Sequence, residues 1–151
     1  MSTPHTAPRL PYGKLAAQQT QALIAFSSAV KESSIGVALV DLIFLRVSQI
    51  NGCAYCIDSH WQDLVKQGRD ARHLNSLAAW QESPFFSPRE RAALGWVDAL
   101  TRSQHELQDA AFAGLQAHFS DQEIAEVTMA IANMNAWNRI GVGMRVPVAT
   151  A

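Results

Sequence analysis

The sequence predicts an all-α domain of six or seven helices around a central helical hairpin. Apolar residues recur at helical spacing along most of the 151-residue chain. Two Ser-x-x-Glu boxes, of the kind that begin helices, occur in its second half. No segment shows the alternation of a convincing strand, and there is no internal repeat or low-complexity segment, so we expect one globular domain.

The expected helices follow one another with short connections. They cover residues 14–31, 37–50, 53–68, 69–80, 87–101 and 108–118, and a last long helix begins at residue 120. Residues 1–13 are proline-rich and should form an extended arm that can lie on a neighbouring subunit. The domain proper then spans 14–147, and 148–151 form a C-terminal tail.

The two later helix starts are the clearest local signals. Ser87 and Glu90 form a capping box with proline at the first helical position, and Ser120 and Glu123 form a second one. Each box satisfies two backbone N–H groups that a helix would otherwise leave unpaired. We therefore expect helices to begin at these two places.

The central hairpin contains both cysteines of the chain. Residues 37–50 are apolar on almost every side, which is typical of a buried helix. Asn51-Gly52 is a strong turn signal, and helical spacing resumes until Gly68 ends the second helix. The pattern predicts two antiparallel helices, with Cys53 in the first turn of the second.

This geometry would bring sulfur, base and acid together. Cys53, Cys56 and His60 stand at i, i+3 and i+7, so they share one helix face. Asp41 lies about as far before the turn as His60 lies after it, so an antiparallel hairpin places them at one level. A helix N-terminus also favours thiolate over thiol. These features point to redox or nucleophilic sulfur chemistry.

Other interpretations of the same residues remain open. The cysteines could be simple core residues, or Cys53, Cys56, His60 and Asp41 could bind zinc, although the sequence lacks the second ligand pair that structural zinc sites generally use. A thioredoxin-like protein is disfavoured because a helix, not a strand, precedes the CxxC pair. Asp41 could instead pair with Arg46, but five positions is not the best spacing on a helix.

Composition excludes several classes of protein. The chain has 48% hydrophobic residues, and its 12 Lys and Arg balance 13 Asp and Glu without any basic cluster. We therefore expect neither nucleic acid nor a membrane as partner. The N-terminus lacks the apolar core of a secretory signal, so we expect the cytoplasm, where thiols are kept reduced.

The motif around the hairpin turn resembles a known family. LRVSQINGCAYCIDSH, together with Asp41, gives an acid, eleven residues, CxxC, three residues and a histidine. This is similar to the core motif of the AhpD-like alkylhydroperoxidases of the carboxymuconolactone decarboxylase superfamily. Residues 86–101 and 119–147 also resemble later helices of that family, so the resemblance covers most of the chain after Gly36.

The resemblance implies a fold and a reaction. It implies an AhpD-like helical domain in which Cys56 is the peroxidatic thiolate, His60 its base, Asp41 the group that holds His60, and Cys53 the resolving thiol. The protein would reduce a hydroperoxide and cycle a Cys53–Cys56 disulfide, with no bound metal or organic cofactor. It would need an external dithiol, in the family typically a lipoyl group on a partner protein, and would assemble as a homotrimer or hexamer.

Two departures from the family pattern weaken the case for fast turnover. The acid is usually glutamate, and the shorter Asp41 is expected to reach His60 only through water. Tyr55 stands where some members have histidine, and a phenol with a pKa of about 10 is a poor base near neutrality. A disulfide reductase or redox sensor is therefore the alternative function. A decarboxylase-type lyase ranks lower, because decarboxylase members generally lack the cysteine pair.

The residues alone leave two further points open. The helix terminus favours Cys53 as the more reactive thiol, whereas His60 favours Cys56. Asn135 and Asn138 match a family motif in the last helix, and we expect them to hydrogen-bond within a subunit interface.

Overall fold

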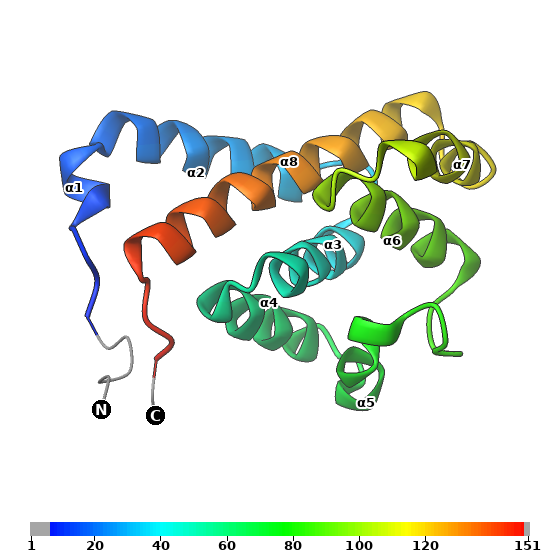
Figure 1. Ribbon diagram of the computed structural model, residues 1–151, viewed down its shortest axis with the longest axis horizontal. Helices are drawn as coiled ribbons and strands as arrows, with labels where there is room; N and C mark the ends of the chain where they lie inside the picture. Colours follow the sequence, from blue (N-terminus) through cyan, green and yellow to red (C-terminus); the bar gives the residue numbers. More distant parts are fainter. Residues whose placement is uncertain (1–6, 150–151) are drawn as a thin grey trace.

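The structure, a computed structural model, describes residues 7–149 and is all-helical over this range (Figure 1). Its elements in order are α1 (Tyr12–Leu15), α2 (Ala17–Lys31), α3 (Val37–Asn51), α4 (Ala54–Lys66), α5 (Ala71–Asn75), the 3₁₀ turn η1 (Leu77–Ala79), α6 (Pro88–Thr101), α7 (His105–Gln116) and α8 (Asp121–Met144). The predicted fold class is confirmed.

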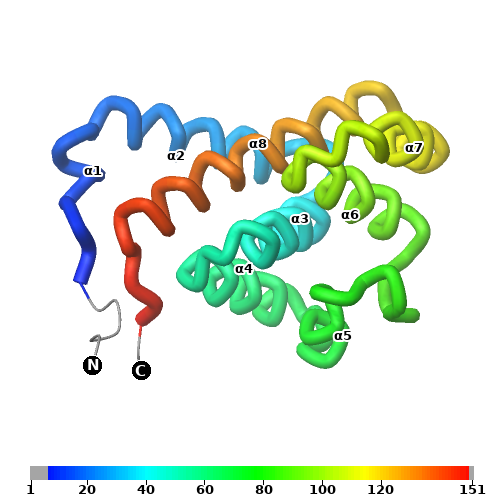
Figure 2. The backbone as a smooth tube through the Cα atoms, in the orientation of Figure 1, coloured from blue at the N-terminus to red at the C-terminus, as the bar shows by residue number. Residues whose placement is uncertain are grey.

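Helix α3 forms the centre of the molecule. Ten consecutive residues, 39–48, are buried, because the helix contacts α4, α6 and α8 on different sides. Figure 2 shows the long α8 crossing above the α3–α4 pair, with α2 running beside it. The nearly uniform apolar character of the central segment thus reflects burial on all sides.

Two glycines shape the central hairpin. Gly52 has a φ of 70°, in the left-handed region that a β-carbon disfavours, and it ends α3. Gly68 has a φ of 87° beyond the end of α4. There the N–H of Arg69 bonds to the carbonyl of Leu64, and that of Gly68 to Val65, which is a Schellman arrangement.

Both predicted capping boxes are present, at Ser87 with Glu90 and at Ser120 with Glu123. The structure divides two of the expected helices: a four-residue α1 precedes α2, and α5 is separated from η1. Helix α7 also begins at His105, three residues before the expected 108. These differences lie at helix ends and leave the order of the elements unchanged.

The buried Arg46 has its own carboxylate. Its Nε and Nη2 donate to the two oxygens of Asp98 on α6, each at 2.7 Å. Both side chains are largely buried, so the pair links α3 to α6 inside the core. Asp41 is therefore left for other partners, which are described below.

The described part of the N-terminal arm lies on this chain's own C-terminal region. The backbone N–H of Arg9 donates to the carbonyl of Met144 at 2.9 Å, and its guanidinium donates to the carbonyl of Gly143 at 2.7 Å. The rest of the predicted arm, residues 1–6, and the end of the tail, 150–151, lie outside the described residues. Within residues 7–149, no helix has the length and apolar character needed to cross a membrane.

Candidate active site

The two cysteines occupy the start of α4 and are joined as a disulfide. Cys53 is the N-cap residue, one position before the predicted first turn, and its sulfur accepts a hydrogen bond from the backbone N–H of Cys56 at 3.4 Å. Both side chains are buried, at 2% and 5% exposure. The helix N-terminus thus faces the sulfurs and favours their anionic form once the bond is reduced.

His60 lies one turn beyond Cys56 and faces Asp41 across the hairpin. Its Nδ1 is 3.6 Å from Oδ1 of Asp41, which is too long for a good hydrogen bond. The predicted juxtaposition of acid and imidazole is thus present, and the shorter side chain of aspartate leaves a gap between them. Asp63, three residues along α4, approaches the same imidazole nitrogen at 3.7 Å.

Asp41 is completely buried but has charged and polar partners. Nζ of Lys31, from the end of α2, is 3.1 Å from Oδ1, and the amide of Gln67 donates to Oδ2 at 2.7 Å. Burial alone would raise the pKa of Asp41. Its contacts with His60, Gln67 and Lys31 together outweigh burial and hold the pKa below the ordinary value of 3.8. Asp41 is therefore a carboxylate at neutral pH.

Three potential metal ligands converge at this point. One ligand atom each from Asp41, His60 and Asp63 lies within 4.8 Å of the others. The ammonium of Lys31 already lies among them, 3.1 Å from Asp41 and 3.7 Å from Asp63. A divalent cation would have to displace this lysine, so the cluster fits an internal ion network better than a metal centre.

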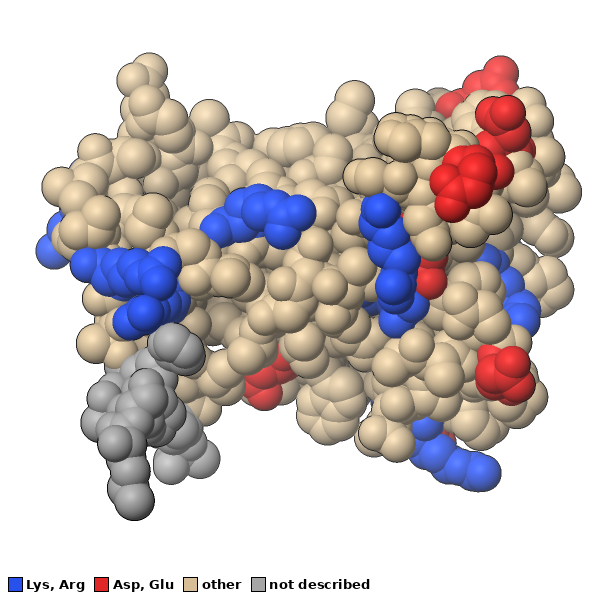
Figure 3. All heavy atoms as spheres, in the orientation of Figure 1, with Lys and Arg blue, Asp and Glu red and all other residues tan. Residues whose placement is uncertain are grey.

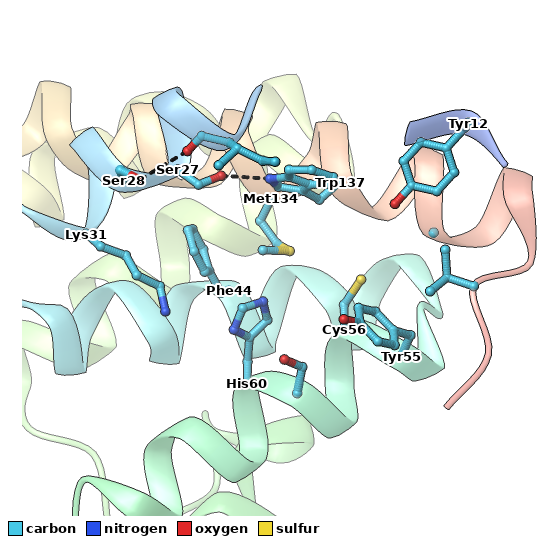
Figure 4. Close-up of a pocket in the computed structure, with 14 residues that line it drawn as sticks. Tyr12, Ser27, Ser28, Lys31, Phe44, Tyr55, Cys56, His60, Met134 and Trp137 are labelled. Atoms are coloured by element: carbon cyan, nitrogen blue, oxygen red, sulfur yellow. Dashed lines mark hydrogen bonds between the residues drawn. The ribbon is translucent and has the colours of Figure 1, made fainter. Parts of the chain in front are cut away.

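Cys56 and His60 open into one cavity of about 430 Å³ between α2, α4 and α8. Figure 4 shows both side chains rising from α4 toward it, with Phe44 beside the imidazole and Lys31 at the far end. The remaining lining is mainly apolar and aromatic and includes Trp137, whose indole N–H is held by Ser27 at 2.7 Å. This cavity could admit an organic molecule beside the Cys56 sulfur.

Cys53 lines a different cavity, of about 510 Å³. That cavity lies between the start of α4 and the end of α8, and it also contacts Arg9 and Arg145. Gly141 on α8 lines both cavities, as do Tyr55 and Val146. The two cysteines of one disulfide therefore border different cavities.

Sequence reasoning found the four central residues but missed several neighbours. The contact of Lys31 with Asp41 could not be predicted, because nothing in the sequence shows that the end of α2 lies over the hairpin. Asp63 and Gln67 follow His60 at i+3 and i+7, so their place on its helix face could have been noticed. Gly141 could not have been noticed in the sequence, because its place in the site depends on how closely α8 approaches the disulfide.

The expectation that Asn138 hydrogen-bonds within a subunit interface needs correction. Asn138 is fully buried inside this chain, so it cannot contribute to a subunit interface. Its amide donates to Oγ of Ser48 at 3.0 Å, and its carbonyl accepts from Asn51 at 3.0 Å. Asn135 also accepts from Asn51, at 2.9 Å. These groups instead join α8 to the end of α3, next to the turn that positions Cys53.

Comparisons with known proteins agree with this architecture. The model of the carboxymuconolactone decarboxylase family matches residues 18–99. The uncharacterized protein YdfG of Bacillus subtilis (strain 168) is 33% identical over 137 residues, which are 90% of this chain and 93% of that protein.

Solved structures show the same likeness. A protein of unknown function from Agrobacterium tumefaciens, described as a candidate antioxidant defence protein AhpD, is 40% identical. It has a TM-score of 0.92, and the match covers 96% of this chain and all of that one. The debrominase Bmp8 shares the fold at 21% identity, with a TM-score of 0.81 over 91% of this chain and 74% of that one.

Proposed function

Because the chain belongs to the carboxymuconolactone decarboxylase family and has an AhpD-like fold, we propose that it is a thiol-dependent alkylhydroperoxidase, an antioxidant oxidoreductase. Cys56 is its peroxidatic residue and Cys53 its resolving thiol. Its likeness to the candidate antioxidant defence protein supports the general class. The more specific assignments depend on the geometry of the site.

One observation carries the assignment of the two thiols. Cys56 and His60 line the same cavity, whereas Cys53 lines the other one. A hydroperoxide in the first cavity would meet a thiol with a base beside it. The N-terminus of α4 favours thiolate at both cysteines, but among the residues that the structure describes an imidazole lines the cavity of Cys56 and none lines that of Cys53, so the geometry supports Cys56 as the nucleophile.

The reaction balances as a two-electron exchange. His60 takes the proton of the Cys56 thiol, and the thiolate attacks the terminal oxygen of the hydroperoxide. The O–O bond breaks, and the alkoxide leaves as an alcohol after His60 returns that proton. Cys56 becomes a sulfenic acid. The Cys53 thiol then attacks its sulfur, water leaves, and the disulfide forms. The peroxide is reduced, and both thiols are oxidised.

Asp41 acts on the base, not on the substrate. Its carboxylate stays ionised, because its pKa is held low, and its charge favours the tautomer of His60 with a proton on Nδ1. Nε2 is then the nitrogen free to exchange a proton with the thiol. Asp41 is therefore a positioning residue.

The cycle closes only with an external electron donor. We propose a dithiol, such as a lipoyl group on a partner protein, and a cytoplasmic setting in which this donor is kept reduced. No bound cofactor is part of the proposal. Assembly as a homotrimer or hexamer also remains part of it.

The test is consumption of cumene hydroperoxide in the presence of dihydrolipoamide. The wild-type protein should turn over, whereas Cys56→Ser should show no activity. The matched variant Cys53→Ser should lose steady turnover but form one sulfenic acid on Cys56, detectable as a dimedone adduct by mass spectrometry. If the dimedone adduct formed on Cys53 in Cys56→Ser and no adduct formed in Cys53→Ser, the roles of the two cysteines would be reversed. If the reduced wild-type protein showed no turnover, the peroxidase function would be refuted.

A redox sensor or disulfide reductase is the second candidate, and one observation favours it. One of the two residues between the cysteines is Tyr55, which is 45% exposed and stands where some members of the family have histidine. Fast formation of the disulfide with one equivalent of peroxide, followed by little turnover, would identify this function. A lyase would instead remain active after loss of both cysteines.

A further inference from the structure

We propose that the cavity beside Cys53 is a binding site for the reductant and that it prefers a dithiol compound that carries a negative charge. The proposal rests on the redox function proposed above and adds a second site to it. It separates the place where the peroxide reacts from the place where electrons enter. The evidence is the position of each sulfur and the charge around Cys53.

The two cavities are neighbours beside the disulfide. Tyr55, Gly141 and Val146 line both of them, but Cys56 with His60 lines the first alone and Cys53 the second alone. A β-carbon at Gly141 would lie 2.8 Å from Sγ of Cys53 and 3.5 Å from that of Cys56. The bond thus packs against the α8 backbone, and an attacking group can approach it from either cavity.

The chemistry of disulfide exchange selects the Cys53 side for reduction. An attacking thiolate approaches one sulfur in line with the S–S bond and displaces the other. Attack on Cys53 through its own cavity makes Cys56 the leaving thiolate, beside His60. This route regenerates the peroxidatic thiolate directly, whereas attack on Cys56 would require the reductant to occupy the peroxide cavity.

The Cys53 cavity is positively charged. Arg9 and Arg145 line it, and its lining contains no Asp or Glu among the described residues. Neither arginine has a carboxylate within 4.0 Å in this part of the chain, and Nε of Arg145 is buried without a hydrogen-bond partner there. Figure 3 shows basic side chains at the end where α8 terminates and acidic ones mostly at the other end of that face.

The helix ends do not cancel this charge. The C-terminus of α8 contributes about half a negative charge and the N-terminus of α4 about half a positive one. These two effects offset each other, so the two guanidinium groups decide the sign. Arg9 uses part of its donor set on the carbonyl of Gly143, and a guanidinium has five N–H donors in total. Donors therefore remain for a carboxylate on the reductant.

The electron transfer takes place in two exchanges. One thiolate of the dithiol attacks Sγ of Cys53, the Cys53–Cys56 bond breaks, and Cys56 leaves as thiolate. The second thiol of the reductant attacks its own sulfur in the mixed disulfide and releases Cys53. The dithiol loses two electrons and becomes a cyclic disulfide, and both cysteines are reduced.

The test compares two reductants that differ in one charge. Oxidised protein is mixed with dihydrolipoate, which is an anion, or with dihydrolipoamide, which is neutral, and the appearance of free thiols is followed. Unit charges at about 4 Å in water predict roughly a fivefold faster reaction with the anion at low salt. This preference should shrink as ionic strength rises.

Substitutions of arginine test which side chains cause the preference for the anionic reductant. Arg145→Gln should bring the ratio of the two rates clearly closer to one, with Arg9 as the remaining cation, whereas Arg9→Lys, which keeps the charge, should preserve most of the ratio. Arg139→Gln is the matched control, because Arg139 is an exposed arginine on the same helix that does not line this cavity. A ratio near one in the wild type, or an equal ratio in wild type and Arg145→Gln, would overturn the proposal.

A second pair of reductants tests whether the site accepts a small anionic dithiol or a lipoyl group on an acidic carrier protein. A dihydrolipoyl-lysine peptide flanked by Asp and Glu is compared with the same peptide carrying Asn and Gln. Preference for the acidic peptide supports a carrier, and preference confined to free dihydrolipoate supports a small molecule. Because peroxide is absent from these measurements, a failed peroxidase assay with an intact charge preference would refute only the peroxidase function.

Discussion

Gly141 and Cys53 are packed so closely that a β-carbon on the glycine would lie 2.8 Å from the cysteine sulfur. Glycine in a helix normally destabilises it by about 0.5–1 kcal/mol relative to alanine. Here the close approach of the sulfur should reverse that preference. We expect Gly141→Ala to lower the free energy of unfolding of the oxidised protein by about 1–3 kcal/mol, through overpacking.

The cause of the destabilisation by Gly141→Ala can be tested in a protein that lacks the Cys53 sulfur. Removal of the sulfur in Cys53→Ala makes room, so adding Gly141→Ala to it should become neutral or stabilising. Gly114→Ala in α7 is the control, because a β-carbon there meets nothing within 4 Å and should be tolerated in every background. Equal losses from Gly141→Ala with and without Cys53 would show that the contact is unimportant.

Ionised Asp41 should contribute stability that depends on pH. Its folded pKa lies below 3.8, so the contribution is fully present above the unfolded value and is lost as pH falls through the folded value. We expect Asp41→Asn to lower the free energy of unfolding by about 1–3 kcal/mol at pH 7. In urea titrations, the difference from wild type should shrink toward pH 3. The exposed Asp109→Asn should show little effect, and a gap that is the same at both pH values would contradict the role of ionisation.

His60 should affect the oxidation step specifically. His60→Gln removes the proposed base, so the rate of Cys56 oxidation by cumene hydroperoxide should fall by about 10²-fold or more. Stopped-flow fluorescence can follow it, because Trp137 lines the same cavity. The exposed His105→Gln serves as control. If the histidine variant oxidised at the wild-type rate, another group would have to act as base.

Arg46 and Asp98 should behave as one buried unit. Arg46→Met leaves the Asp98 carboxylate buried without its cation and should lower the free energy of unfolding by about 3–5 kcal/mol. The double variant Arg46→Met/Asp98→Leu should lose clearly less than the sum of the two single variants. Additive losses in equilibrium unfolding would mean that the two charges do not stabilise each other.

Asn138 should matter for the fold but not for assembly. Asn138→Ala removes the hydrogen bonds to Ser48 and Asn51 inside the core and should lower the free energy of unfolding by about 1–3 kcal/mol. Light scattering should give the wild-type molecular mass, because the side chain is inside one chain. A changed mass with unchanged stability would restore the interface interpretation.

The sequence predicted what depends on local rules. The structure has both capping boxes, which depend on residues three positions apart at the starts of α6 and α8. It also has the glycine turns and the juxtaposition of Asp41 with His60, which follow from spacing along the α3–α4 hairpin. The contacts that sequence reasoning missed join segments far apart in the chain. Lys31 reaches Asp41 only because α2 lies over the hairpin, and Gly141 matters only because α8 crosses the disulfide. Such contacts depend on how the helices pack, which no local pattern encodes.

The Cys53–Cys56 disulfide also has a consequence for chain entropy. It joins residues only three positions apart. A cross-link over so short a loop restricts the unfolded chain little, by roughly 2 kcal/mol compared with nearly 5 for a loop of about 100 residues. The hydrophobic core around α3 consists mainly of aliphatic and aromatic side chains, which keep their contacts whether the two sulfurs are bonded or not. The domain is therefore expected to remain folded in both redox states, so that each oxidation and reduction changes two sulfur atoms without unfolding the domain.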